Sequence, residues 1–175
     1  DKVFLNYSAR NDWSSTLPAG SQSFGYQAIG VSAILSEILD MSSTPVDYLK
    51  VRASIGTTGK DASPYLLTST FNVNPDFAAF GDIYTINAPF NGQTGISRGG
   101  LIGNNTLTPE RTTSRELGLD VEFLKGRITA SYTYYNNTSA EQIVNIALSP
   151  ASGYSSTAAN VGEMVNRGCL LYTSP

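Results

Sequence analysis

The chain has 175 residues, of which 11 are Lys or Arg and 14 are Asp or Glu, and its net charge of −3 provides no basic surface for nucleic acid. Charged residues make up 14% of the sequence, against about a quarter in typical soluble domains. The chain has no histidine and one cysteine, which excludes Ser-His-Asp and Cys-His catalytic sites, zinc sites of the usual kinds and an internal disulfide.

No run of the sequence approaches the roughly 18 consecutive apolar residues of a membrane-spanning helix. Tyrosine, glycine, serine, threonine and asparagine are abundant, which favours strands and turns over helices. Any membrane residence is therefore expected to be through a β-barrel. The N-terminal residues lack the order of a signal peptide, so any export signal is expected to lie outside this chain.

Three strands are predicted in the first third of the chain. Residues 3–10, 26–34 and 48–57 alternate apolar and polar side chains, which is the period of a strand with two different faces. A polar loop follows the first strand. Residues 36–47, between the second and third strands, predict a short helical turn that is capped by Ser36 and ends before the next proline.

A stretch of about fifty residues, 58–107, comes next and is dense in Gly, Asn and Pro with scattered aromatic side chains. A structureless loop of this length is evidence against a compact soluble domain unless the loop is functional. Its aromatic side chains could stack on sugar rings or on a peptide, and they could equally pack the loop upon itself. The predicted ligand-binding residues are Tyr65, Phe77, Phe80, Tyr84, Phe90 and Arg98. Phe71 is a further aromatic candidate in the same segment.

The segment 107–143 predicts a β-hairpin with one apolar and one polar face. Side chains alternate with a period of two on both sides of a two-residue turn predicted at Lys125-Gly126. The register that matches the two apolar faces begins with the pair Phe123 and Ile128, and a slip of one residue would move every apolar side chain to the polar face. The side chains predicted to face lipid are Leu117, Leu119, Val121, Phe123, Ile128, Tyr132 and Tyr134.

The other face of this hairpin carries Glu116, Asp120 and Glu122. Unpaired buried charges are costly, so this face has to meet water. Both strands can run well past the usual length in soluble domains, which suits a tilted membrane strand of about 9 to 11 residues. We therefore expect lipid on the apolar side and an aqueous lumen on the polar side.

Carboxylates at this spacing could form a catalytic pair, but solvation or pairing with cations is the commoner role on a strand. Lys50 and Arg52 share the inward face, either in a ladder with the acidic strand or in contact with a plug. These residues are assigned to a lumen wall together with Glu116, Asp120 and Glu122, and no catalytic site is predicted. No metal site and no cofactor are predicted either, because residues 76–82, DFAAFGD, lack the spacing of a calcium loop.

The rest of the chain predicts a loop near residues 149–157 and a last strand that begins near Ala159. Long connections then follow the first, third and fifth strands, and short ones follow the second and fourth. Because neighbouring antiparallel strands alternate in direction, all the long loops fall at one end of the sheet, as in outer-membrane barrels.

Several phrases of the sequence, in order, resemble the barrel portion of SusC/RagA-type TonB-linked outer membrane proteins. They are LKVRASIGTTG at 49–59, PFNGQTG at 89–95, LTPERTTSRELGLDVEFLKGRI at 107–128, TYYNNTSAEQI at 133–143, SPASGYSS at 149–156 and NVGEMVNRG at 160–168. The resemblance implies a barrel of about 22 strands with a plugged lumen. The expected fold is all-β, a partial antiparallel transmembrane β-barrel of about six strands, with 58–107 as a long extracellular loop and with unpaired edges.

The sequence departs from the family pattern in two places. Arg115 stands where relatives tend to have an aromatic residue, and near the extracellular rim it could meet lipopolysaccharide phosphates. After Gly168 the expected alternation gives way to CLLYTSP. We therefore interpret 1–168 as the barrel fragment and 169–175 as a non-native or truncated tail; recovery of a genomic locus with this heptapeptide in frame would contradict that.

The family implies a transport receptor and no enzyme: TonB-dependent uptake of a nutrient such as an oligosaccharide or a peptide, at the bacterial outer membrane. The implied partners are the TonB complex, through regions absent here, a SusD-like lipoprotein, and outer-membrane lipid and lipopolysaccharide. The alternative is a soluble β-sandwich that acts as a carbohydrate-binding or adhesion module, which predicts that the apolar faces bury against each other. An outer-membrane enzyme is a third alternative, which the absence of histidine disfavours.

Overall fold

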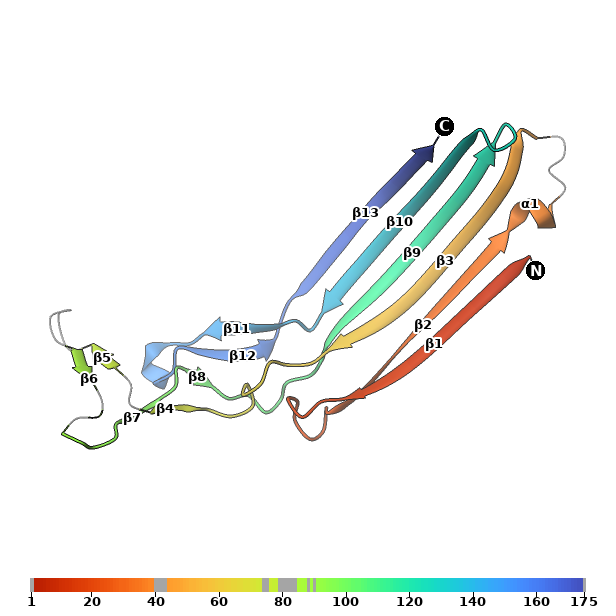
Figure 1. The fold of residues 1–175 in the computed structure, drawn as a ribbon. Helices are drawn as coiled ribbons and strands as arrows, with labels where there is room; N and C mark the ends of the chain where they lie inside the picture. Colours follow the sequence, from red (N-terminus) through yellow and green to blue (C-terminus); the bar gives the residue numbers. More distant parts are fainter. Residues whose placement is uncertain are drawn as a thin grey trace.

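A computed structural model describes residues 2–39, 44–73, 89 and 91–174, and it also describes the backbone of residues 76–78 and 85–87. Its main feature is one six-stranded antiparallel sheet in the order β1-β2-β3-β9-β10-β13, whose long strands lie side by side in Figure 1. The strands are β1 (Val3–Trp13), β2 (Ser23–Ile34), β3 (Val46–Lys60), β9 (Glu110–Phe123), β10 (Ile128–Ala140) and β13 (Glu163–Ser174).

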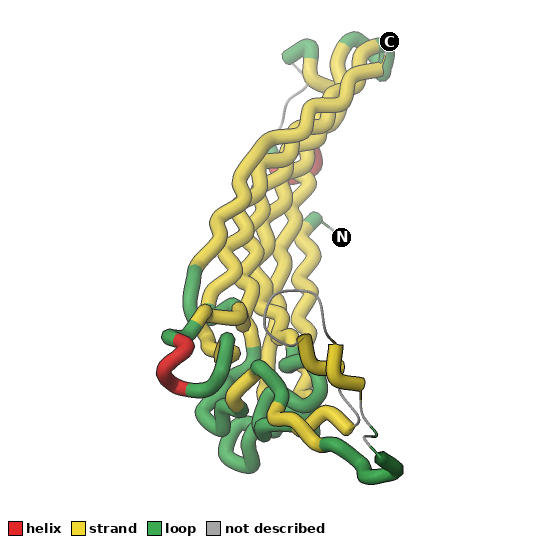
Figure 2. The backbone as a smooth tube through the Cα atoms, turned by 90° about the vertical axis from the view of Figure 1, so that its left-hand side faces the viewer, coloured by secondary structure: helices red, strands yellow, loops and turns green. Residues whose placement is uncertain are grey.

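These strands are long, from 11 residues in β1 to 15 in β3, whereas strands in globular proteins usually have about five or six. The sheet is twisted but not closed, since β1 and β13 are its two edges. Figure 2 shows the twisted sheet from the side, with the loops and short strands gathered beyond one end. The open six-stranded sheet is the partial barrel that the sequence predicts.

The long connections carry the short elements. β4 (Phe71–Val73) pairs with β7 (Ile96–Arg98), and β5 (Asp76–Ala78) pairs with β6 (Thr85–Asn87). β8 (Leu101–Ile102), β11 (Ile143–Ala147) and β12 (Ser156–Asn160) form a three-stranded sheet, and a 3-10 turn covers Pro150–Ser152. The predicted structureless loop at 58–107 is thus wrong in part: β3 extends to Lys60, and short strands follow.

The hairpin register is confirmed along its whole length. Phe123 pairs with Ile128, and the pairing continues without a slip to Arg111 and Ala140. The predicted two-residue turn is wrong, because the connection is Leu124–Arg127 and its first three residues all have positive φ angles, of 56°, 62° and 73°.

Contacts from Asp47 at the start of β3, and from Pro45 just before this strand, hold the turn. Oδ2 of Asp47 accepts hydrogen bonds from the backbone N–H groups of Lys125, at 2.5 Å, and Gly126, at 3.3 Å. The backbone N–H of Leu124 donates to the carbonyl of Pro45 at 3.1 Å. A neighbouring strand therefore satisfies turn groups that the local sequence leaves unpaired.

The two faces of the hairpin continue across the sheet. On one face Ala53 lies opposite Leu117, and on the other Lys50 lies opposite Asp120. Large side chains of the apolar face stay exposed, with Leu5 at 72% and Leu117 at 57%. No second sheet of the described chain packs on this face, so the soluble β-sandwich alternative is wrong. An apolar surface of this extent is typical of a membrane or protein contact.

Two further predictions need correction. The short helix α1 (Leu35–Ile38) begins before Ser36, and Ile34 is its N-cap without a side-chain hydrogen bond. The last strand of the wall begins at Glu163 and not near Ala159, because residues 156–160 pair with β11 and β8 in the small sheet.

The change of pattern at Cys169 does not end the last strand. β13 continues to Ser174, because its backbone ladder with β10 needs no alternation of side chains. The origin of residues 169–175 stays a prediction.

In the described part of the chain, no helix is long and apolar enough to cross a membrane.

Candidate functional site

A network of polar side chains crosses the middle of the polar face. The Arg52 guanidinium on β3 lies with Nε 3.0 Å from Oδ2 of Asp120 on β9, and its Nη2 donates to Oδ1 of Asp120 at 3.3 Å and to Oγ1 of Thr133 at 3.4 Å. The Ser131 hydroxyl on β10 donates to Oδ1 of the same carboxylate at 2.7 Å. Three neighbouring strands are therefore linked by side chains as well as by their backbones.

Gly118 makes room for this network. It lies between Arg52 and Thr133 in the register, and a Cβ atom there would stand 2.9 Å from the guanidinium carbon of Arg52. The Arg52 guanidinium thus lies over the backbone of β9 at Gly118. From there it reaches the carboxylate of Asp120, two residues further along the strand.

The structure places the predicted wall residues on one face but joins only two of them. Arg52 pairs with Asp120, whereas Lys50, Glu116 and Glu122 make no ion pair among the described residues. Their side chains remain available to water or to a partner on that face. The described residues also hold no cluster of acidic or cysteine side chains that could bind a metal ion.

The long connections meet in a small hydrophobic core, which we call the loop core. It consists of Leu17, Ala62, Leu107 and Ala158, with exposures of 0% to 4%, and these are the only buried hydrophobic residues in the described part of the chain. The partly buried hydrophobic residues that pack against the loop core are Phe24, Leu66, Leu67 and Ile143. Because its members come from the connections β1–β2, β3–β9 and β10–β13, three loops form one packed body.

Asn160 ties two of these connections together by hydrogen bonds. Its Oδ1 accepts from the backbone N–H of Thr108 at 2.9 Å, and its Nδ2 donates to the carbonyls of Thr108, at 2.7 Å, and Glu141, at 2.8 Å. Nδ2 of Asn104 donates to the carbonyl of Ala158 at 2.9 Å. These amide side chains satisfy backbone groups in the way that a neighbouring strand would.

Neither asparagine is predicted from the sequence, because a polar residue inside a loop gives no signal of a partner more than fifty residues away. The phrase NVGEMVNRG at 160–168, which supports the family resemblance, begins with Asn160. That phrase was the one available signal.

The predicted ligand-binding residues are not brought together in the described structure. Tyr65 is exposed and has a positive φ of 65°, and Phe71 is exposed on β4. The backbone of Phe77 lies in β5, and its side chain is outside the described part. The residues that lie outside the described chain altogether are Phe80, Tyr84 and Phe90.

Arg98 contacts another loop. Its guanidinium lies 4.6 Å from the centre of the Tyr154 ring, in the β10–β13 connection. Hydrogen bonds from Arg98 and then Ser69 lower the pKa of the Tyr154 hydroxyl below its ordinary value. This contact occupies one face of the guanidinium and joins the 58–107 segment to the β10–β13 loop.

A protein family, several known proteins and several solved structures match this chain. The model of the family described as "TonB dependent receptor-like, beta-barrel" matches residues 1–169. The chain is similar to two proteins of Formosa agariphila, TonB-dependent receptor P26, with 28% identity over 171 residues, and TonB-dependent receptor P3, with 29% over 170. These alignments cover 96% and 95% of the chain but 16% of each relative, so the chain spans about a sixth of their length.

Solved structures share the fold. The RagAB peptide importer in its 'closed-closed' state matches with a TM-score of 0.80 and 23% identity, over 98% of this chain and 18% of that one. The siderophore receptor PirA from Pseudomonas aeruginosa matches with a TM-score of 0.58 and 17% identity, over 97% of this chain and 28% of that one. The six strands therefore correspond to a portion of a larger barrel wall.

Proposed function

This chain belongs to the TonB dependent receptor-like β-barrel family, and from this premise we propose that it forms part of the wall and outer loops of a receptor that imports a nutrient by TonB-dependent active transport. The family is one of outer-membrane transporters and receptors and not of enzymes. The observation that carries the proposal is the two-faced sheet of long strands, with exposed leucines on one side and the Arg52–Asp120 network on the other. Such a sheet is stable where lipid covers one face and an aqueous lumen the other.

The proposed nutrient is an oligosaccharide or a peptide. Exposed aromatic side chains such as Tyr65 and Phe71 suit both, because their faces can stack on sugar rings or on apolar peptide side chains. One fold relative is a peptide importer by its name, which supports the peptide alternative. No covalent step and no cofactor is part of the proposed mechanism.

The segment 58–107 is proposed to bind the nutrient, and the structure divides it into an anchored part and an outer part. Ala62 and Leu107 belong to the loop core, so their loss would disrupt folding as well as binding. Between them, the backbone N–H of Gly99 donates to the carbonyl of Thr70 at 2.8 Å. These two residues are close enough to be joined by a short turn.

The test replaces residues 71–98 of the full-length receptor by Asn-Gly, a sequence that favours tight hairpin turns. We expect loss of nutrient binding, measured by calorimetry with oligosaccharide and peptide mixtures, while the barrel still inserts and resists denaturation by detergent at low temperature. A companion variant, Arg98→Gln alone, keeps the outer part but removes one predicted ligand-binding side chain together with its Tyr154 contact. Binding and uptake equal to wild type after the replacement would refute the assignment of this segment.

Three partners are proposed on the basis of family membership. A SusD-like surface lipoprotein would close the loop side, the TonB complex would act through regions outside this chain, and lipopolysaccharide would surround the outer part of the wall. Affinity purification of the full-length receptor from its own outer membrane tests the first of these. A lipoprotein recovered in an equimolar amount is expected, and recovery of the receptor alone would contradict this partner.

A further inference from the structure

The outward face of the sheet changes character along one row of paired residues. In this row Tyr7, Ile29 and Ile55 stand on β1, β2 and β3. The register then continues from Ile55 to Arg115 on β9, Asn136 on β10 and Arg167 on β13. The neighbouring row toward the short turns holds apolar or small side chains, including Leu117 and Tyr134. Two arginines therefore stand at the loop-side border of the apolar face.

The two arginines are placed to act together. Both are exposed, and each is the direct register partner of Asn136. Since neighbouring strands are about 4.8 Å apart, their Cα atoms are separated by about 10 Å, and two side chains of this length can reach one anion from both sides. Neither makes an ion pair within the described part of the chain.

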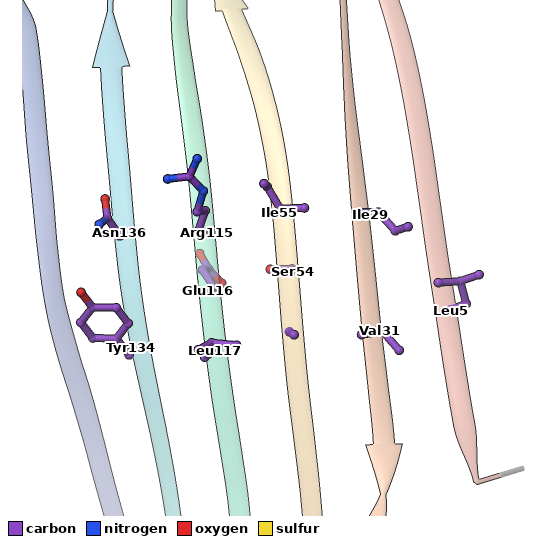
Figure 3. Close-up of a pocket in the computed structure, with 11 residues that line it drawn as sticks. Leu5, Ile29, Val31, Ser54, Ile55, Arg115, Glu116, Leu117, Tyr134 and Asn136 are labelled. Atoms are coloured by element: carbon purple, nitrogen blue, oxygen red, sulfur yellow. The ribbon is translucent and has the colours of Figure 1, made fainter.

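A hollow lies beside Arg115 on the same face. It has a volume of about 650 Å³ and is lined mainly by apolar side chains of β1, β2, β3, β9 and β10. Ala53 is too small to fill the space between Val31 and Leu117, and Figure 3 shows Arg115 and Asn136 at the loop-side border, next to Leu117 and Tyr134. The hollow is thus an apolar groove whose border carries the Arg115 guanidinium and the Asn136 amide.

The height of this border fits the outer surface of a membrane. Phe123 and Arg115 on β9 are separated by about 26 Å along the strand, which is about 20 Å along the membrane normal at a tilt near 40°, close to the apolar band of about 25 Å. The long loops lie on the Arg115 side, which is the extracellular side of such a barrel. The arginines therefore stand where the headgroups of the outer leaflet begin.

We propose that this surface binds a phosphorylated glycolipid of the outer leaflet, of the lipid A type: an acyl chain lies in the hollow over Ala53, and a phosphate is held between Arg115 and Arg167. The planar guanidinium of arginine binds phosphate through paired N–H groups, and the apolar lining suits an acyl chain. This inference rests on the proposed contact of the receptor with lipopolysaccharide. It does not depend on which nutrient is imported.

The experiment uses the full-length receptor extracted from outer membranes in mild detergent, with bound lipid counted by native mass spectrometry. The double variant Arg115→Gln and Arg167→Gln is expected to lower retained lipid A about tenfold, in line with the loss of charge-assisted hydrogen bonds. Ala53→Leu, which fills the hollow, is expected to lower retention as well. The matched control is Arg127→Gln, an exposed arginine at the short-turn end, which should retain lipid A like wild type.

Several results would overturn the proposal. The first two are unchanged retention of lipid A by the double variant and an equal loss of lipid A from the Arg127→Gln variant. The third is that the receptor binds lipid A equally well after its phosphates have been removed. The fourth is that the double variant loses a phospholipid and keeps its lipid A. A change in the number of receptor copies per particle, without any change in bound lipid, would assign the surface to a second copy of the receptor. Nutrient uptake is measured in the same strains, and it should stay at the wild-type level, so a failure here is distinguishable from a failure of the transport function.

Discussion

The wall and the loop core are built on opposite principles within one chain. In the wall, Leu5 and Leu117 are more than half exposed and the strands are held by backbone ladders and by polar contacts such as Arg52–Asp120. In the loop core, Leu17 and Leu107 have no exposed surface. Apolar side chains of the wall thus depend on lipid for their environment, whereas those of the loop core are shielded from water by protein, as in a soluble domain.

The largest effect is expected from a cavity in the loop core. Leu107→Ala should destabilise the packed loops by about 2 to 5 kcal/mol, because the surrounding residues from three connections cannot all close the space. Hydrogen exchange of the full-length receptor should show faster exchange at residues 143–147 and 156–160 and unchanged protection in β9 and β10. The matched variant Leu117→Ala on the apolar face should change much less, since lipid can fill its space. Equal effects of the two variants would contradict the difference between the loop core and the wall.

A smaller effect is expected from the link between two loops. Asn160→Ala should cost about 1 to 3 kcal/mol, because it leaves the N–H and carbonyl of Thr108 without their partner. The readout is the rate at which a protease cuts the β10–β13 connection in the folded receptor. Asn145→Ala, in the same connection but without a side-chain hydrogen bond among the described residues, is the control. Cutting at the wild-type rate would show that the loops are held by the hydrophobic core alone.

The smallest effect is expected on the polar face of the wall. Arg52 and Asp120 are both partly exposed, at 43% and 29% of their side-chain surface, so water screens the pair and a coupling on the order of 1 kcal/mol is expected. A double-mutant cycle with Arg52→Gln and Asp120→Asn, measured by urea unfolding from vesicles, gives this coupling. Raising the salt concentration should reduce it. A coupling of several kcal/mol would mean that this face is drier than a lumen wall.

Much of the wall could be predicted from the sequence. The period of two in residues 116–123 and 128–134 is strict, and it predicts which side chains share a face and which residue pairs with which. It failed at the turn, where contacts from Asp47 and Pro45 support four connecting residues in place of two. It also failed at the start of the last strand, because residues 156–160 have a strand-like sequence but pair in a different sheet.

The loop region shows where sequence patterns stop being informative. The predicted site at 58–107 rested on aromatic composition, and the one cationic member, Arg98, packs on Tyr154 from another connection. Neither this contact nor the hydrogen bonds of Asn160 has a periodic signature. The Arg98–Tyr154 contact and the Asn160–Thr108 hydrogen bonds each join residues more than fifty positions apart, which meet only because the strands place their connections at one end.

The two faces of the wall follow from the sequence alone, since alternation along a strand is a local property that places successive side chains on opposite faces. The packing of the loops and the position of Arg115 and Arg167 on either side of Asn136 could be seen only in the folded chain. These arrangements depend on strand order and register over the whole sheet. Such long-range placement follows from the fold as a unit and from no single segment.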